Sequence, residues 1–494
     1  MTSYFVAFLL SLMVGTVMTV VVRHLAHRFG WLDQAKTSRK IHVRPIPRLG
    51  GVAIVCGFFA PLVGLLLVDS GVGYHYKAHP ELILGLFGGG LVVAALGLYD
   101  DLRGAGAKLK FFVQFSVAGA LYALGLRIEL IATPFGGAIP LGMLALPFTL
   151  LWIVGVINAM NLVDGLDGLA GGVAFFGVAT NFILALVRGD VVTCLMMAAL
   201  GGAVLGFLIF NFNPASIFMG DTGSMFLGFV LATVSIKTST KSGTAVAMLV
   251  PIIALGLPIM DTLLAMLRRT MLGRPVFSAD KEHIHHRVMS RFFLSQRHAV
   301  LVLYGICCLF TLTALALSYA NSAQSAMLLG GIGVVVVVLM RKLGYLSLRS
   351  AAGVGETRRK NIQLRALVRE LNDRIAAARD LQGLWDAVRP LAEAVDATRL
   401  ELELVSGEPQ LRDHITFETT RPAGAALPFH FSVEVKLSEE PLGSLALTWQ
   451  DGRVEVNRDE ELALELASDS IARAVARVWA VKAADPAKVV ALRG

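Results

Sequence analysis

The chain has 494 residues, of which 55% are hydrophobic, 16% are charged and four are cysteines. An average soluble protein is about 45–50% apolar and about 25% charged. This balance excludes a disordered protein, a collagen-like fibre and an ordinary cytosolic enzyme, and the few cysteines exclude a disulfide-stabilised scaffold. It favours a protein that crosses a membrane several times. The net charge of +8 is then explained by basic loops that set membrane topology, and no nucleic-acid partner is expected.

Charge is distributed unevenly along the chain. Residues 1–344 contain 24 basic and 13 acidic residues, whereas residues 345–494 contain 20 and 23. The predicted fold class is therefore an all-α polytopic membrane protein with a C-terminal soluble α+β domain. The predicted domains are a membrane domain over 1–342, a helical linker over 343–395 and a cytoplasmic α+β domain over 396–494, for which regulation is one candidate role.

Eleven segments contain enough apolar residues to cross the hydrocarbon core, which takes about 20 residues of helix. These predicted spans are 3–22, 50–68, 81–99, 110–126, 143–160, 171–187, 191–210, 223–238, 244–265, 299–319 and 323–340. The connections on one side contain sixteen Lys and Arg residues, and those on the other side contain five. Since cytoplasmic loops are enriched in basic residues, the first side is predicted to be cytoplasmic. The N-terminus is then outside, and the C-terminal domain is in the cytoplasm.

Five of the thirteen acidic residues of the membrane part lie in three short motifs. Asp100 and Asp101 occur in LGLYDDLRG, Asp164 and Asp167 in NAMNLVDGLDGLAGG, and Asp221 in FNFNPASIFMGDTGS. An ionisable residue inside a membrane costs about 2.5–3.5 kcal/mol at the centre of a span, so such residues usually mark function. All three motifs fall at the predicted cytoplasmic ends of different spans, and they can therefore converge on one site.

Each acidic motif also has a purely structural interpretation. The Asp100–Asp101 pair is compatible with a helix end that faces water, and Asp221 with a helix N-cap. Asn158, Asn161, Asp164 and Asp167 recur every three residues, which is compatible with a polar seam along one helix face. A structural role for all three motifs at once, on the same side, is the weaker explanation.

A fourth polar motif, SADKEHIHHRV, contains His283, His285 and His286 on the same predicted side. Interfacial histidines on a basic loop are one interpretation and a zinc site is another. The zinc interpretation lacks an HExxH-like spacing or a cysteine partner. A site rich in carboxylates and free of sulfur instead suits magnesium, which binds one or two carboxylates together with substrate phosphates. With no GxxxxGK[ST] loop, the residues suggest phosphoryl transfer from a soluble donor to an acceptor in the membrane.

LGLYDD, NAMNLVDGLDGLAGG, FMGDTGSMFLG, ADKEHIHH and HVRPIPRLGGVAI, at these spacings, resemble motifs of the polyprenyl-phosphate N-acetylhexosamine-1-phosphate transferases. The resemblance covers roughly residues 1–342. It implies transfer of a sugar 1-phosphate from a UDP-N-acetylhexosamine to polyprenyl phosphate, with release of UMP. The H-I-H-H spacing resembles the branch that uses GlcNAc, whose members start cell-envelope glycans such as O-antigen. It also implies a bacterial inner membrane with the active site in the cytoplasm.

The resemblance assigns expected roles to the motif residues. Asp221 is the expected magnesium ligand (manganese being a possible substitute), with Asn161 as a second ligand. Asp100 and Asp101 are expected near the metal and the acceptor phosphate, one of them as the base. Asp164 and Asp167 are expected on the nucleoside side of the donor, and the histidines on its phosphates and sugar. Further candidate binding residues are Asn158, Asn161, Lys40, Arg44 and Arg48. For the three basic residues, ordinary loop charge is an equally good explanation.

The C-terminal part follows a different pattern. Leu364, Leu367, Val368, Leu371 and Ile375 have the 3/4 spacing of an amphipathic helix. Alternating segments such as RLELELV and FHFSVEVKL then predict strands, and a last helix is predicted from about Asp459 to Val481. This order loosely resembles a GAF or PAS domain, so regulation, ligand sensing and a homodimer are all open.

Two other classes of function remain as alternatives. A transporter or flippase would also contain acids within spans, although its charges usually lie near the midplane of the membrane. A CDP-alcohol phosphotransferase is disfavoured because no arginine follows Asp164–Gly165 in a DGxxAR-type pattern. Within the resembling family, UDP-MurNAc-pentapeptide or another UDP-N-acetyl sugar is an alternative donor.

Overall fold

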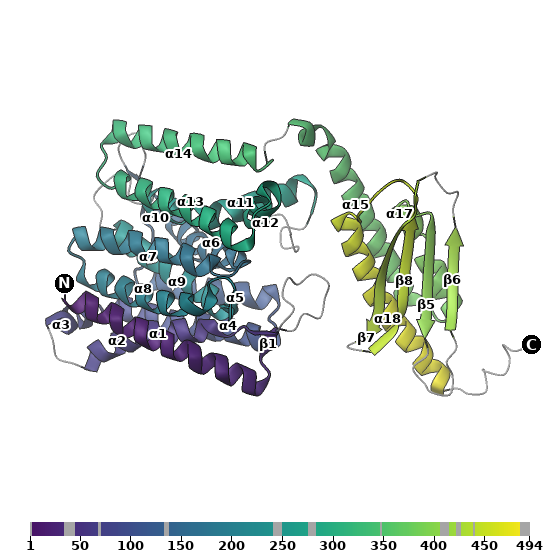
Figure 1. Cartoon of the computed structure of the whole chain (residues 1–494), viewed down its shortest axis with the longest axis horizontal. Coiled ribbons are helices and arrows are strands. Elements are labelled where there is room, and N and C mark those ends of the chain that lie inside the picture. The colour runs from purple at the N-terminus through teal and green to yellow at the C-terminus, as the bar shows by residue number, and fades with distance from the viewer. Residues whose placement is uncertain are drawn as a thin grey trace, which may run out of the picture. The chain divides into compact units, whose positions relative to one another are not determined.

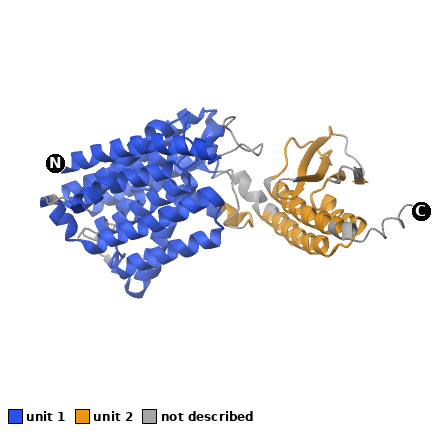
Figure 2. Ribbon diagram, turned by 90° about the horizontal axis from the view of Figure 1, so that it is seen from below, with its two compact units in different colours: residues 1–267, 279–347 blue, residues 268–278, 348–494 orange. Residues whose placement is uncertain are grey.

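The computed structural model describes residues 2–33, 45–67, 71–132, 138–240, 249–274, 283–345, 348–405, 414–420, 426–437 and 440–484. It divides into two compact units (Figure 2). The first unit contains Met1–Leu267 and Ala279–Ser347, and the second contains Arg268–Ser278 and Leu348–Gly494. Each unit is described by itself.

Up to residue 345 the structure is almost entirely helical (Figure 1). The helices are α1 (Thr2–Phe29), α2 (Gly50–Leu67), α3 (Gly71–Lys77), α4 (Pro80–Arg103), α5 (Ala107–Ala123), α6 (Ala145–Val163), α7 (Leu169–Val187), α8 (Val191–Asn211), α9 (Gly220–Thr240), α10 (Leu249–Ala254), α11 (Gly256–Met271), α12 (Ile284–Phe292), α13 (Gln296–Leu317) and α14 (Ser322–Lys342). Short hairpins β1 (Leu32–Asp33) with β2 (Ile46–Pro47) and β3 (Leu130–Ala132) with β4 (Ala138–Pro140) connect some of them.

Within the described residues, eight helices are long and apolar enough to cross a membrane: α1, α2, α4, α6 with the 3₁₀ turn before it, α7, α8, α13 and α14. The prediction of a mainly helical membrane protein is confirmed in this form. The predicted span 244–265 is not one helix where it is described, because α10 ends at Ala254 and α11 begins at Gly256. Pro258 has no N–H to donate to the carbonyl of Ala254, so a single regular helix is interrupted there.

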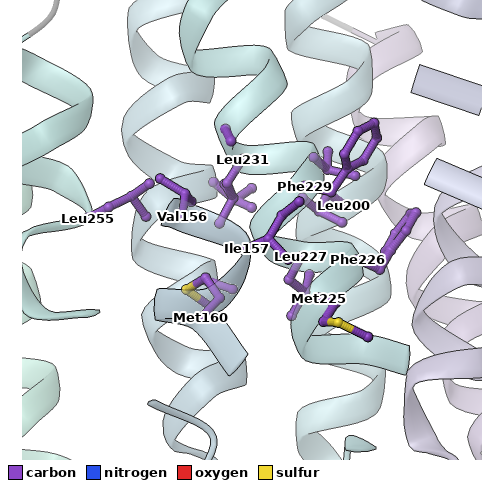
Figure 3. Close-up of a cluster of buried hydrophobic side chains, with 14 of the residues drawn as sticks. Val156, Ile157, Met160, Leu200, Met225, Phe226, Leu227, Phe229, Leu231 and Leu255 are labelled. Atoms are coloured by element: carbon purple, nitrogen blue, oxygen red, sulfur yellow. The ribbon is translucent and has the colours of Figure 1, made fainter. Parts of the chain in front are cut away.

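Helix α9 lies at the centre of the first unit. It packs against α2, α4, α6 and α7, and almost all of its described side chains are buried. Figure 3 shows apolar residues of α9, among them Leu227 and Leu231, on the side of Val156 and Ile157 of α6. Because α9 is surrounded by other helices rather than by lipid, Asp221 in its first turn contacts polar groups of the protein such as the Lys110 ammonium.

Glycines let the neighbouring helices approach the first turn of α9. A Cβ atom on Gly51 of α2 would lie 2.0 Å from the backbone nitrogen of Gly223. A Cβ on Gly97 of α4 would lie 2.5 Å from the Cα of Thr222. The backbone hydrogen bond from Gly51 N–H to Met219 O, 2.7 Å long, continues this close contact. The start of α9 is thus held between α2 and α4.

Gly51→Ala is expected to destabilise the protein by about 1–3 kcal/mol, because the new methyl group would meet backbone that cannot move aside. The measurement is the melting temperature of the purified protein in detergent. The matched control is Gly64→Ala on the same helix, where an added Cβ atom would have no described atom within 4 Å; alanine there should leave stability unchanged or slightly higher. Equal melting temperatures for the two variants would contradict the close packing of α2 on α9.

The second unit is a helix–sheet structure. Its elements after the membrane part are α15 (Leu348–Ala377), α16 (Leu381–Val388), α17 (Leu391–Ala394), β5 (Arg399–Val405), β6 (His414–Thr420), β7 (Phe429–Leu437), β8 (Glu440–Trp449) and α18 (Arg458–Ala484). The strands form an antiparallel sheet in the order β6-β5-β8-β7. Alternate residues of β5, namely Leu400, Leu402 and Leu404, are buried, as the alternating pattern predicted.

The helices predicted as a linker are part of this second unit. Leu371 and Ile375 of α15 and Leu384 of α16 are at most 2% exposed and share a core with Leu464 and Ile471 of α18. The amphipathic stripe seen in the sequence therefore covers the apolar face of a folded domain. The unit boundary near residue 348 differs from the predicted domain start at 396 for this reason.

Candidate active site

Asp101 holds the N-terminus of α9. Its Oδ1 accepts a hydrogen bond from the backbone N–H of Asp221 at 2.9 Å. Its Oδ2 accepts from the backbone N–H of Thr222 at 3.0 Å and from the Thr222 hydroxyl at 2.7 Å. The first N–H groups of a helix have no partner within it, and negative charge there is favoured by the helix dipole. Asp101 of the first motif thus fixes the position of Asp221 of the third.

Asp100 and Asp221 meet on one lysine. The Nζ atom of Lys110, in the first turn of α5, donates to Oδ2 of Asp100 and to Oδ2 of Asp221, each at 2.6 Å. The three side chains are between 15% and 27% exposed, so a ligand can reach them. Asp100 also accepts a hydrogen bond from the backbone N–H of Ala105. Helices α4, α5 and α9 therefore present two carboxylates and one ammonium group at a single accessible point.

The two asparagines of the second motif differ in their surroundings. Asn161 donates to the Ser224 hydroxyl at 2.9 Å, which places its amide beside the first turns of α9. Asn158 donates to Oε1 of Gln114 at 2.7 Å and to the carbonyl of Val154 at 2.8 Å. Gln114 is fully buried. The structure brings Asn161 to the acidic cluster, whereas Asn158 joins α6 to α5 one turn deeper, as expected for the polar seam between helices.

Asp164 directly follows α6 and faces the same cluster. Burial, together with the negative charges of Asp221, Asp101 and Asp167, raises the pKa of Asp164 to about 8. At neutral pH this carboxyl group therefore holds a proton until a cation or a donor group arrives. Such concentration of acidic charge is typical of a site that receives positive charge with its substrate.

Asp167 is buried and tied to the loop before α9. Its Oδ2 accepts from the side-chain amide of Asn213 at 2.9 Å and from the backbone N–H of Ala215 at 3.0 Å. The neighbouring Gly168 N–H donates to Asn211 at 3.0 Å, and its carbonyl accepts from the Tyr304 hydroxyl at 2.6 Å. The second and third motifs are therefore joined by direct hydrogen bonds.

The histidine motif is held by Asp261 of α11. Oδ1 of Asp261 accepts from the backbone N–H of Ile284 at 2.8 Å, and its Oδ2 lies 3.0 Å from Nδ1 of His283. Both residues of this pair are buried, with side chains 4% and 8% exposed. The arrangement caps α12 and directs a proton on His283 towards Nδ1. Asp261 thereby fixes the orientation of the first histidine.

His285 joins the histidine motif to the second motif. A Cβ atom on Gly165 would lie 2.5 Å from Nε2 of His285, so the imidazole packs directly on this glycine. Burial, together with the neighbouring His286, lowers the pKa of His285 to about 3. The neutral ring stacks on that of His283 at a centroid distance of 5.8 Å and is tilted against that of His286 at 4.3 Å. Its buried Nδ1 makes no hydrogen bond to any described residue, which leaves a polar atom available to a ligand.

The predicted basic residues of the first loop are only partly described. Lys40 and Arg44 lie outside the described residues. Arg48 is exposed, and its carbonyl lies 2.1 Å from a Cβ placed on Gly220, which has the left-handed φ of 72°. Glycine is required at this position, where the loop before α2 passes the start of α9.

Two residues of the site were not predicted from the sequence. Lys110 and Asp261 are isolated ionisable residues within or at the edge of predicted spans. The rule that an ionisable residue in a span marks function applies to them equally, and would have found both.

Among the described residues, no group of three or more His, Cys, Asp or Glu side chains has the geometry of a metal site.

Comparisons with known proteins match the part of the chain that contains these motifs. The family described as glycosyl transferase family 4 matches residues 83–239, which contain the first three motifs. A probable undecaprenyl-phosphate N-acetylglucosaminyl 1-phosphate transferase from Bacillus subtilis is 40% identical over 317 residues, covering 64% of this chain and 85% of that protein. A decaprenyl-phosphate N-acetylglucosaminephosphotransferase from Mycolicibacterium smegmatis is 36% identical, with coverage of 64% and 83%. An undecaprenyl-phosphate alpha-N-acetylglucosaminyl 1-phosphate transferase from Escherichia coli is 27% identical, with coverage of 61% and 80%.

The identity extends well beyond the matched family segment, and it spans most of the length of each relative. The chain belongs to glycosyl transferase family 4.

Proposed function

We propose that the protein transfers GlcNAc 1-phosphate from UDP-GlcNAc to undecaprenyl or another polyprenyl phosphate, releasing UMP and starting a cell-envelope glycan. The observation that carries the proposal is the meeting of Asp100, Lys110 and Asp221 at an accessible point, beside Asp164, in a chain of this family. The relatives named above act on a polyprenyl phosphate and an N-acetylglucosamine 1-phosphate group by their names.

Magnesium fits the donor atoms of this cluster. Asp221, Asp100 and the side chain of Asn161 offer hard oxygen donors without sulfur, and the Lys110 ammonium already lies between the two carboxylates. Magnesium needs only one or two carboxylates, since substrate phosphates and water complete its shell. Asp221 would hold the ion, with Asn161 and Asp100 beside it. When bound, the ion would stabilise negative charge that develops on the departing phosphate.

The proposed reaction is a direct displacement. An oxygen of the acceptor phosphate attacks the donor phosphorus that is bonded to the sugar oxygen. The bond from that phosphorus to the bridging oxygen breaks, and UMP leaves with both electrons of the bond. Asp100 is the candidate base or orienting group, because its carboxylate is partly exposed beside Lys110, whereas the carboxylate of Asp101 holds the start of α9. Lys110 is suited to bind phosphate oxygens beside it.

The remaining motif residues are proposed to bind the donor. Asp164 and Asp167 flank the loop that packs against His285, which favours a nucleoside on one side of this contact and the diphosphate and sugar on the other. The neutral His285 has an Nδ1 that no described residue engages, which suits a hydrogen bond to the donor. The acidic residues of the three motifs lie at the ends of helices. A transporter usually has its charged site near the middle of the membrane, so this position favours the transfer reaction over transport.

We infer that this end of the helices faces the cytoplasm of a bacterial inner membrane, since the basic loops lie on the same side. The proposed topology has eleven crossings, in which the shorter α5, the buried α9 and the α10–α11 segment join the eight helices named above. The order of helices, a four-stranded antiparallel sheet and a last helix supports a GAF- or PAS-type regulatory role for the second unit, and a homodimer belongs to the same proposal.

The reaction is tested by incubating the purified protein with magnesium, undecaprenyl phosphate and single UDP-sugars, and by measuring UMP and the lipid product. UMP release with UDP-GlcNAc that depends on both the lipid and magnesium is expected. UDP-GalNAc, UDP-QuiNAc, UDP-FucNAc and UDP-MurNAc-pentapeptide are the comparison donors. A rate with any of these that exceeds the rate with UDP-GlcNAc would overturn the sugar assignment, and no UMP with any donor would overturn the reaction.

Direct displacement is distinguished from a two-step route by leaving out the acceptor. With stoichiometric protein and labelled UDP-GlcNAc but no polyprenyl phosphate, no UMP is expected, because the attacking oxygen belongs to the missing lipid. A burst of UMP together with phosphosugar-labelled protein would instead indicate a covalent aspartyl-phosphate intermediate.

A further inference from the structure

The connection between α11 and α12 carries the chain into the second unit. The first unit ends after Leu267 and resumes at Ala279, and the intervening Arg268–Ser278 belongs with the C-terminal domain. Helix α11 contains Asp261, the partner of His283, and ends at Met271. Part of the chain that leads to the histidine motif therefore belongs to the second unit.

Two side chains of α15 complete the end of α11. The carbonyl of Leu272 accepts a hydrogen bond from the amide of Asn361 at 3.0 Å, and that of Gly273 accepts from the guanidinium of Arg365. Asn361 is only 3% exposed. The last carbonyl groups of a helix have no partner within it, so α15 provides partners here. Gly273 has φ of 68°, and a Cβ there would lie 3.0 Å from Cγ of Arg358, which keeps its backbone close to α15.

Arg274 then forms an ion pair with Asp459 in the first turn of α18. Its Nε and Nη2 lie 2.9 and 2.6 Å from Oδ2 of Asp459, and Nη2 of Arg365 lies 3.4 Å from Oδ1. The side chains of Arg274 and Asp459 are 14% and 6% exposed. A two-point contact of this kind is specific in direction, and its burial protects it from screening by salt. Replacing Asp459 leaves the largely buried guanidinium of Arg274 without its counterion, and replacing Arg274 leaves Asp459 with only the longer contact to Arg365.

We propose that the C-terminal unit is a positioning element of the donor site, with Arg274 and Asp459 as its positioning residues. This inference rests on the proposed function, because the role of the histidines in donor binding comes from there. His283 lies nine positions after Arg274. Asp261, which holds His283, lies on α11, and the chain directly after α11 is held by the Arg274–Asp459 pair and by two side chains of α15. Such restraint lowers the entropy that must be lost when the histidines are ordered around the donor.

The test compares full-length wild type, R274A, D459A and the double variant R274A/D459A. The KM for UDP-GlcNAc is expected to rise by about fivefold or more, in the range of coupling between separate sites, while kcat changes less than twofold. The double variant should resemble each single variant rather than add their effects. R453A is the matched control, since Arg453 pairs with Glu460 in the same turn of α18 but not with the segment Arg268–Ser278.

Hydrogen exchange gives a readout that does not depend on activity. The peptide over α12 should exchange faster in R274A than in wild type and R453A, with α18 unchanged. The inference would be overturned if R274A had the same KM for UDP-GlcNAc and the same exchange rate in α12 as the wild type. It would also be overturned if R453A raised the KM and the exchange rate as much as R274A does. If R274A does not fold, R274K, which keeps the charge but loses the two-point contact, is measured instead, and a wild-type KM there would overturn it. If the wild type released no UMP, only the proposed function would be overturned. The hydrogen-exchange comparison of α12 in wild type, R274A and R453A would still test whether the C-terminal unit positions the histidine motif.

Discussion

Replacing Asp221 by asparagine is expected to reduce turnover by about 1000-fold or more while the protein stays folded. The substitution keeps the shape of the side chain and removes one of the two carboxylates on Lys110. Loss of a single group that stabilises charge in a transition state lowers the turnover rate by about 100- to 1000-fold. Asp221 is also the proposed magnesium ligand, so the loss is expected at the upper end of this range or beyond it. Turnover is measured as UMP release, and folding as a single elution peak and an unchanged melting temperature.

Asp190→Asn is the matched control for this experiment. Asp190 caps α8 by accepting from the N–H of Thr193 at 3.2 Å and pairs with Lys237 at 3.4 Å, with both side chains nearly buried. It is thus another aspartate at a helix start paired with a lysine, but at the opposite end of α8 and α9. D190N should lower the melting temperature and keep turnover.

Magnesium provides a second readout for Asp221 that does not depend on catalysis. A ligand that binds only the folded state raises the melting temperature. Magnesium should therefore stabilise the wild type and D190N but not D221N. Substantial turnover in D221N, or equal stabilisation of D221N by magnesium, would refute the metal assignment.

The position of the site could be predicted from the sequence because it depends on composition and topology. Acids are scarce in the membrane part, and those in the three motifs fall on the side with the basic loops. The structure brings the motifs of Asp101, Asp167 and Asp221 together through direct hydrogen bonds. Packing of α9 between α4 and α6 is what turns neighbouring helix ends into one cluster.

Pairings across helices could not be predicted in the same way. The position of Lys110 at the start of α5 depends on the turn after Arg103, and its contact with Asp221 depends on where α9 begins. Likewise, Asp261 reaches His283, 22 positions further along the chain, only because the start of α12 folds back onto α11. These contacts follow from tertiary packing, on which local sequence patterns carry no information.

The second unit shows the same division between local pattern and packing. The apolar stripe of α15 and the alternation of β5 were predicted from spacing alone, and their residues Ile375 and Leu402 are buried. The partner of that stripe, α18, lies about 100 residues further along the chain and could not be assigned. Integration of Arg268–Ser278 into this unit was unpredictable for the same reason.

Separating the adjacent Asp100 and Asp101 is expected to divide activity from stability. Successive residues of a helix point about 100° apart, so only one of the pair can face the accessible cluster. Asp100→Ala should reduce turnover by about 100-fold with a small change in melting temperature, since its carboxylate is partly exposed beside Lys110. Asp101→Ala should lower stability by about 1–3 kcal/mol, because it removes the acceptor of three hydrogen bonds at the start of α9.

Asp101→Ala should also reduce turnover, because Asp221 is the first residue that the cap holds in place. Both Asp100→Ala and Asp101→Ala are therefore expected to lose activity, and the melting temperature distinguishes them, because only Asp101→Ala should lower it strongly. Asp101→Asn keeps one acceptor oxygen and should recover part of the stability and part of the turnover together, whereas Asp100→Asn should recover neither measurably. A stable, inactive Asp101→Ala protein beside an unstable Asp100→Ala protein would reverse the assignment and make Asp101 the residue that faces the acceptor phosphate.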